Sequence, residues 1–196
     1  MNSGYNRTSL DAAVNSFEQA LRLDPGLTTA KVGLAAGLGE TYYLTGGHAG
    51  VDFRRVDASV NNALSAAPGS AWAHLAKAKE MFVLPGLGDA LSEADAAVGF
   101  DRNFAEAHAF RGVLRMFSGQ AKEAMPELET AIRLNPRSPS RNQWESDLCS
   151  AYAHLGQWET AVEWCRRSIA TDATYFVPYV NLAAAYGWLD RDSEAR

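Results

Sequence analysis

The sequence lacks several features that would point to a membrane protein, a secreted protein or a nucleic-acid partner. No apolar run approaches the ~18 residues that a membrane helix needs. The first residues are polar and contain no apolar stretch of the kind found in secretory signals. Lys and Arg number 18 against 23 Asp and Glu, which gives a net charge of −5, and no basic stripe is present. We therefore expect a cytoplasmic chain without a membrane or nucleic-acid partner.

Catalytic and cofactor motifs are missing as well. The stretch GLAAGLGE, residues 33–40, follows no predicted strand and precedes no Lys-Ser or Lys-Thr, so it is not a phosphate-binding loop. There is no nucleophile elbow. His74 and His108 stand 34 residues apart, at equivalent positions of a repeat. Equivalent positions of adjacent helical hairpins lie about 10 Å apart, which is too far for two ligands of one metal ion. We expect packing or capping roles for them, and no catalytic residue, metal site or cofactor.

What the sequence does contain is a period of 34 residues. Ala63, Ala97 and Ala131 follow one another at that spacing, and Pro68 and Pro136 each stand five residues after one of these alanines. A fixed period of this length is typical of stacked helical hairpins, each of which packs mainly against its neighbours.

One complete unit, residues 105–138, shows how the period specifies helices. The spacings of four and three put Ala124, Leu128 and Ala131 on one helix face. Gly119 stands where the chain must turn between helices, since glycine tolerates a positive φ. Pro136 ends the second helix because it cannot donate a backbone hydrogen bond. The alanines allow close helix approach and Leu128 fills the remaining gap.

Three segments, SFEQALRLDPG, ETAIRLNPRS and AYAHLGQWETAVEWC, each hold several positions of a known repeat motif in register. On these segments the chain resembles a tetratricopeptide repeat (TPR) array over almost its whole length. The resemblance implies an all-α fold, a right-handed α-α superhelix of about ten antiparallel helices. The aromatic residue usual at the fourth position of a unit is replaced by His74, His108 and Glu145 in three units, and Tyr179 occupies that position in the last.

We predict a single array over residues 1–196. Its parts are a partial unit (1–27), a unit with a loop insertion (28–70), two regular units (71–104 and 105–138), a unit with a short insertion (139–175) and a truncated unit (176–196). The first insertion is predicted as a loop around Gly46, Gly47 and Gly50. Neither end shows the polar cap usual in solenoids, so we interpret the chain as a fragment of a larger protein.

The TPR resemblance also implies a binding surface, because the first helices of successive units line a concave groove. The groove positions of the family correspond here to Trp72, Leu75, Lys79, Phe82, Val83, Glu106, Val113, Met116, Phe117 and His154. Aromatic residues and methionine are enriched at interface cores. The same side chains could instead pack between helices or lie under a helix that is missing from this fragment. The clamp that some TPR proteins use for chaperone tails is absent.

Two functions follow from this surface. The first is a non-catalytic scaffold that binds a peptide or helix in the apolar groove. The alternative is a regulatory or oligomerisation module of a larger bacterial signalling protein, because the chain is also similar to the TPR region that follows class III adenylate cyclase or transcriptional-regulator domains. In that case the uncapped ends would contact another copy or another domain of the parent chain.

The two cysteines, Cys149 and Cys165, stand 16 residues apart at two small-residue positions of one predicted hairpin. We therefore expect them to lie near each other in space. Two reduced thiols in the core are the favoured interpretation. A disulfide or a redox switch is the alternative.

Overall fold

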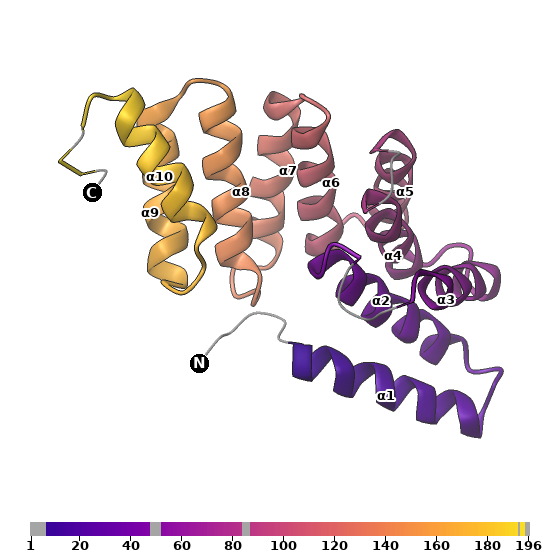
Figure 1. The fold of residues 1–196 in the computed structure, drawn as a ribbon. Helices are drawn as coiled ribbons and strands as arrows, with labels where there is room; N and C mark the ends of the chain where they lie inside the picture. Colours follow the sequence, from indigo (N-terminus) through magenta and orange to yellow (C-terminus); the bar gives the residue numbers. More distant parts are fainter. Residues whose placement is uncertain (1–6, 48–51, 84–86, 192, 195–196) are drawn as a thin grey trace. The chain divides into compact units, whose positions relative to one another are not determined.

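The computed structural model describes residues 7–47, 52–83, 87–191 and 193–194, and these form ten α-helices and no strand (Figure 1). The all-α prediction of about ten helices is therefore confirmed. The helices are α1 (Arg7–Leu23), α2 (Thr28–Leu44), α3 (Phe53–Ala66), α4 (Ala71–Phe82), α5 (Leu87–Phe100), α6 (Ala105–Phe117), α7 (Ala121–Leu134), α8 (Arg141–His154), α9 (Trp158–Thr171) and α10 (Val177–Trp188).

Local sequence signals explain several helix ends. The Ser70 side chain caps α4 by accepting a hydrogen bond from the Ala73 amide at 3.3 Å. Gly119 and Gly156 turn the chain between α6 and α7 and between α8 and α9 with φ of 77° and 69°. Helix α7 ends at Leu134, two residues before Pro136, as predicted. Of the predicted loop glycines, Gly46 and Gly47 follow α2, and Gly50 lies outside the described residues.

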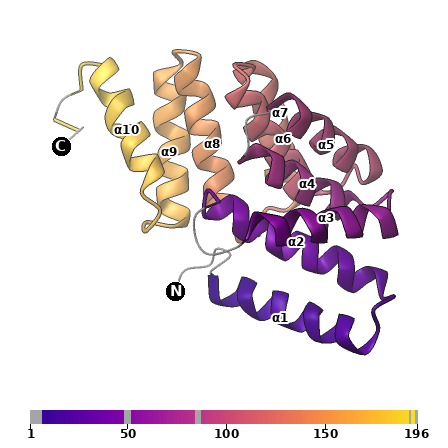
Figure 2. The same ribbon diagram turned by 45° about the vertical axis from the view of Figure 1, so that its right-hand side comes forward.

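The helices pack into two compact units, Tyr5–Phe110 and Arg111–Arg196, which we call the N-terminal and C-terminal units. In the N-terminal unit, α2 contacts α1, α3 and α4, and α4 contacts α5. In the C-terminal unit, α8 contacts α7, α9 and α10. Helices α8, α9 and α10 lie side by side (Figures 1 and 2). The predicted unit boundaries within a single array stay a prediction.

Residues in phase with the repeat form the contacts between helices. Ala124, Leu128 and Ala131 on α7 are fully buried, and the equivalent alanines of α5, Ala90, Ala94 and Ala97, are buried as well. A Cβ added to Gly112 would lie 2.9 Å from Leu128 Cγ. Helices α6 and α7 therefore meet at a glycine, and Leu128 fills the contact, as the spacing predicts.

Replacing Ala131 by leucine is expected to destabilise the C-terminal unit by about 1–3 kcal/mol, because the added atoms have no space in a fully buried contact. Thermal unfolding followed by circular dichroism measures the change. Ala170→Leu, at an exposed position of α9, is the matched control and should leave the melting temperature almost unchanged. An unchanged melting temperature for Ala131→Leu would contradict the assignment of Ala131 to the packed face.

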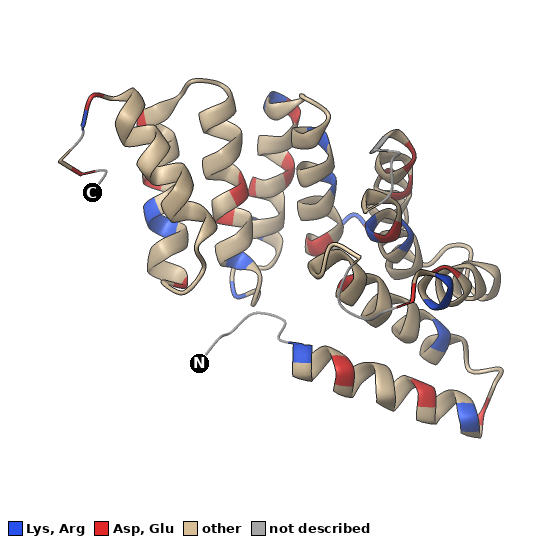
Figure 3. Ribbon diagram, viewed as in Figure 1, with Lys and Arg blue, Asp and Glu red and all other residues tan. Residues whose placement is uncertain are grey.

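Most helices carry charged residues of both signs, α5 carries only acidic ones, and α10 carries none (Figure 3). The fully buried carboxylates of Glu80 and Glu145 have partners. Glu80 accepts from Lys77 Nζ at 3.2 Å. Glu145 accepts from Arg141 Nε at 3.0 Å and from the Thr171 hydroxyl at 2.8 Å. These pairs offset the cost of removing charge from water.

Candidate functional site

Trp72, a predicted groove residue, lines an apolar cavity of about 360 Å³ in the N-terminal unit. We call this cavity the Trp72 groove. The Trp72 side chain is 46 % exposed, and its ring centroid lies 4.4 Å from that of Phe104. The remaining walls come from α1 and α2 and include Leu10, Phe17, Val32, Gly33, Gly37 and Glu40. The groove therefore combines one exposed indole with an apolar floor.

Glycines of α2 allow α1 to lie close to it beneath the groove. A Cβ added to Gly33 would lie 2.4 Å from the Phe17 ring, and one added to Gly37 would lie 3.0 Å from Val14 Cγ2. Larger residues at these two positions would push α1 away from α2. The stretch GLAAGLGE thus serves helix packing, and it also shapes the floor of the groove.

Three aromatic rings from three helices gather next to Lys79. Tyr43, Phe82 and Phe110 have ring centroids 5.1–5.8 Å apart in edge-on arrangements. Lys79 Nζ lies 5.7 Å from the centroids of Tyr43 and Phe110, and it forms an ion pair with Glu40. Both charged side chains are largely buried. Lys79 is therefore held by Glu40 and two rings, and Glu40 carries this pair into the wall of the groove.

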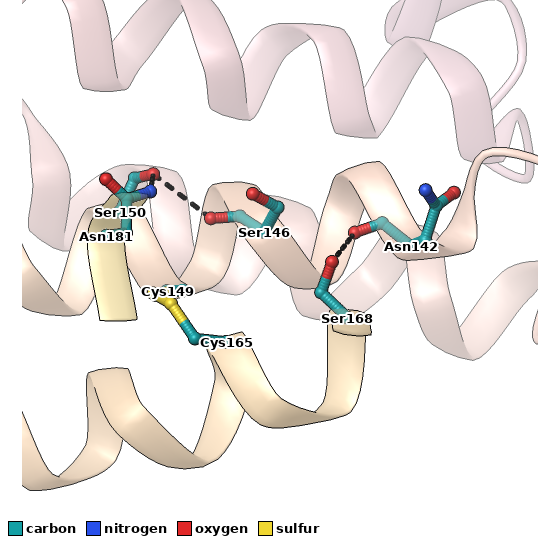
Figure 4. The surroundings of a disulfide bond; sticks show 7 residues. All are labelled: Asn142, Ser146, Cys149, Ser150, Cys165, Ser168 and Asn181. Carbon is teal, nitrogen blue, oxygen red and sulfur yellow. Dashed lines mark hydrogen bonds between the residues drawn. A yellow bond between two sulfur atoms is a disulfide. The ribbon is translucent and has the colours of Figure 1, made fainter. Parts of the chain in front are cut away.

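A second cavity, of about 230 Å³, lies in the C-terminal unit. Its lining residues are Ser150, Ala153, His154, Trp158 and Asn181, and we call it the Trp158 cavity. Asn181 Nδ2 donates to Ser150 Oγ at 2.7 Å, so α10 and α8 are joined at its rim (Figure 4). The Trp158 ring stacks on that of Trp188 with centroids 5.3 Å apart and 3° between the planes.

Cys149 of α8 and Cys165 of α9 form a disulfide (Figure 4). The favoured prediction of two reduced thiols is therefore wrong for this structure, and the alternative holds. Both sulfurs are fully buried, and the Cα atoms are 5.2 Å apart. The cysteines take the positions at which α6 and α7 use Gly112 and Leu128, so the bond replaces a packing contact of the repeat. Ser168 Oγ donates to the Asn142 carbonyl at 2.6 Å, further along the same seam.

The fourth position of three units makes a recurring hydrogen bond to a main-chain carbonyl in the turn that precedes its helix. His74 Nε2 contacts the Pro68 carbonyl at 2.9 Å, and His108 Nε2 contacts the Arg102 carbonyl at 3.0 Å. The Tyr179 hydroxyl donates to the Ala173 carbonyl at 3.1 Å. Each bond spans six residues and fastens the turn between two units. Packing or capping roles were expected for the two histidines, and both hold the turn before their helix.

The geometry of repeated hairpins agrees with comparison to known families, because residues 105–138 match the family model described as tetratricopeptide repeat. Residues 105–138 therefore form a TPR unit. The match covers one unit, the one that includes the contact between Gly112 and Leu128. Among curated protein sequences, no match was found.

Solved structures of TPR proteins share this fold. A thermophilic TPR protein of Thermus thermophilus is 20% identical with a TM-score of 0.68, and the match covers 90% of each chain. YrrB, a TPR protein with an unusual peptide-binding site, is 16% identical with a TM-score of 0.65, covering 93% of this chain and 88% of YrrB. MamA is 21% identical with a TM-score of 0.64, covering 84% of this chain and 86% of MamA. At these identities the likeness establishes the TPR fold.

The predicted groove residues of this TPR chain are divided between the two units. In the N-terminal unit, Trp72 is accessible and Phe82 is half-buried, whereas Leu75 is only 2 % exposed and cannot reach a partner in this conformation. Val83 packs against the core cluster around Leu38 and Ala76. The others in that unit are Lys79, held by Glu40, and Glu106, half-buried at the start of α6. In the C-terminal unit, Val113 is buried, Met116 is half-buried, and Phe117 and His154 are exposed.

Residues outside the family's groove positions complete both cavities of the TPR chain. Phe17 of α1 and Gly33 of α2 line the Trp72 groove. Trp158 and Asn181 line the Trp158 cavity together with His154, a predicted groove residue. The sequence did contain a signal for Trp158, because this tryptophan stands two residues after Gly156 and begins the second helix of its hairpin. No sequence signal identified α1 as a groove wall.

Within residues 7–47, 52–83, 87–191 and 193–194, no group of three His, Cys, Asp or Glu side chains is placed to hold a metal ion. In the same residues, no helix has the length and apolar character to cross a membrane.

Proposed function

We propose that this TPR chain is a non-catalytic scaffold that binds an apolar protein segment, a peptide or a helix, in the Trp72 groove. The observation that carries the proposal is the pairing of an indole that is 46 % exposed with an apolar cavity of about 360 Å³. Cavities of this size and lining are typical of ligand pockets. The TPR fold, and the peptide-binding site that YrrB has on the same fold, support a protein or peptide partner.

A bound segment would gain its binding energy from apolar burial, and the charged residue in the groove wall would fix its orientation. Covering Trp72 and filling the space above Gly33 and Gly37 removes apolar surface from water, at roughly 25 cal/mol per Å². Tryptophan is enriched among the residues that dominate binding energy at interfaces. Glu40 is the charged residue in the wall, and it is paired with Lys79. A bound segment would therefore present apolar side chains to α1 and α2 and keep its own charges outside.

Trp72→Ala is expected to weaken the binding of apolar peptides, selected against the chain from a random library, by about tenfold or more, which corresponds to about 1.4 kcal/mol. Leu23→Ala is the control, since it removes an apolar side chain of the same unit that is 89 % exposed and does not line the groove. Isothermal titration calorimetry measures both. Equal affinities for the Trp72→Ala variant and the unchanged chain would refute the groove assignment.

The alternative function, a regulatory or oligomerisation module of a larger bacterial signalling protein such as an adenylate cyclase, is favoured by one observation. Helix α10 has no charged residue, and Val180 and Trp188 on it are exposed, as is Phe176 just before it. An exposed apolar patch of this kind marks an interaction surface. Sedimentation over a concentration series tests self-association, and a strict monomer would remove that version of the alternative.

The disulfide bears on the compartment in which the scaffold works. Disulfides persist in oxidising compartments and are rare in the cytosol. We therefore propose an oxidising compartment for this chain in place of the cytoplasm expected from the sequence, on the support of the buried bond between Cys149 and Cys165.

A further inference from the structure

Asp147 of α8 differs from three acidic residues of the interior, Glu40, Glu80 and Glu145. Glu40, Glu80 and Glu145 each have a basic partner. Asp147 is half-buried, and within the described residues it makes no hydrogen bond and no ion pair. Tyr175, in the segment before α10, lies close enough to sense this acid. Burial, and after it the charge of Asp147, raises the pKa of Tyr175 to about 12. An unpaired carboxylate in a partly buried position is costly and is typical of functional sites.

The Trp158 cavity begins one helical turn beyond Asp147. Asp147, Ser150 and His154 follow one another on α8 at spacings of three and four, so they share a face of the helix. Two of them line the cavity, and Asn181, 34 residues after Asp147, joins it from α10. Figure 4 shows Asn181 pointing at Ser150, which in turn donates to the Ser146 carbonyl at 3.1 Å. The amide oxygen of Asn181 makes no hydrogen bond within the described residues.

We propose that this face of the C-terminal unit binds a lysine or arginine of an extended protein segment, with the cation at the Asp147 carboxylate and the side chain two residues further along in the Trp158 cavity. The proposal rests on the scaffold function and adds a charged specificity to it. The partner's charge follows from complementarity, because the free group at the site is an acid and the neighbouring acid, Glu145, is already paired with Arg141.

The spacing of the two features fits an extended chain. At 1.5 Å per residue along α8, the centre of the cavity, between Ser150 and His154, lies roughly 7 Å from the level of Asp147. Side chains two residues apart on one side of an extended segment are about 6.7 Å apart. The Trp158 ring, held by its stack on Trp188, offers an apolar wall to the second side chain. An aromatic or aliphatic residue two positions from the basic one suits this wall.

The test uses the blocked pentapeptide Gly-Lys-Ser-Phe-Gly, titrated into the ¹⁵N-labelled full chain and followed by NMR. The expected result is a set of amide shifts at Asp147, Ser150 and His154 and at the Asn181 side chain. Asp147→Asn should weaken the binding about tenfold. Glu163→Gln, which removes the same charge from an exposed position of α9, should leave it unchanged. A peptide with glutamine in place of lysine, and one with lysine and phenylalanine adjacent, should both bind more weakly.

Charge reversal makes the test independent of any loss of affinity through misfolding. Asp147→Lys should bind Gly-Glu-Ser-Phe-Gly more tightly than the lysine peptide. Equal binding of the lysine and glutamine peptides, or equal weakening by Asp147→Asn and Glu163→Gln, would overturn the proposal. Trp72→Ala should not change the affinity for the lysine peptide. If the lysine peptide does not bind as expected but Trp72→Ala still weakens the binding of apolar peptides, the scaffold function stands without the Asp147 site. If the lysine peptide binds as expected but Trp72→Ala has no effect on apolar peptides, only the Trp72 groove is refuted.

Discussion

Replacing both cysteines by alanine, C149A/C165A, is expected to lower the free energy of unfolding of the C-terminal unit by about 3 kcal/mol. The disulfide closes a loop with a sequence separation of 16 residues, and a loop of about that length is worth roughly 3 kcal/mol through the unfolded chain. Alanine suits the folded state, because α4 and α5 place Ala78 and Ala94 at the equivalent positions, both fully buried. The loss should therefore come from the missing bond and not from a packing defect.

Urea unfolding of the full chain, followed by tryptophan fluorescence, measures this loss. The single variant C149A breaks the same bond and should lower the free energy of unfolding by a similar amount. This result would show that the loss comes from the missing bond and not from the second substitution. Thiol reagents should find no reactive group in the folded, unreduced chain, because both sulfurs are bonded and buried. If the double variant and the unchanged chain unfold at the same urea concentration, the disulfide does not stabilise the fold.

Asp147→Asn is expected to stabilise the protein at pH 8, by up to about 4 kcal/mol. Burial raises the pKa of Asp147 to about 7 from its ordinary 3.8, and a tenfold change in an acid's ionisation constant corresponds to about 1.4 kcal/mol. The unfolded state ionises above its own pKa, near 3.8, whereas the folded state keeps the proton until near pH 7. The acid therefore costs the fold nothing below about pH 4, costs progressively more as the pH rises towards 7, and costs a constant amount above that.

Comparison of the two chains over a pH series tests the sign as well as the size. The difference in unfolding free energy between Asp147→Asn and the unchanged chain should grow from pH 5 to pH 7 and then level off. Glu163→Gln, at its exposed position, should show no such growth. A variant that is less stable than the unchanged chain at pH 8 would show that the carboxylate is a stabilising group. A stabilising substitution that also removes the response to the lysine peptide would be a trade between stability and binding.

Packing followed from the sequence because it depends on the period alone. The spacing of Ala124, Leu128 and Ala131 predicted one buried helix face, and all three are fully buried. Gly119 was predicted as a turn and has a positive φ. The state of the two cysteines did not follow, since small-residue positions suit a thiol and a half-cystine equally well. Their spacing predicted proximity, which the disulfide confirms.

The groove was harder to predict, because a position rule taken from a regular repeat assumes that every first helix has the same neighbours. Leu75 occupies such a position and is buried. Lys79 occupies another and is held by Glu40, a contact with a helix 39 residues away in sequence. Trp72 does line a cavity, but its opposite walls belong to α1 and α2. Asp147 carried no signal at all, since its lack of a partner is visible only in three dimensions.

The fastening at the fourth position of each unit has a consequence for finding divergent repeats. Two histidines and a tyrosine make the same bond to a main-chain carbonyl six residues earlier. In the unit with Glu145 at that position, the donor is Arg141, whose guanidinium reaches the Pro136 carbonyl at 2.9 Å. The requirement is thus a donor of sufficient reach and not an aromatic ring. A sequence profile that scored a long donor side chain at this place would therefore detect repeat units that make the bond without an aromatic residue.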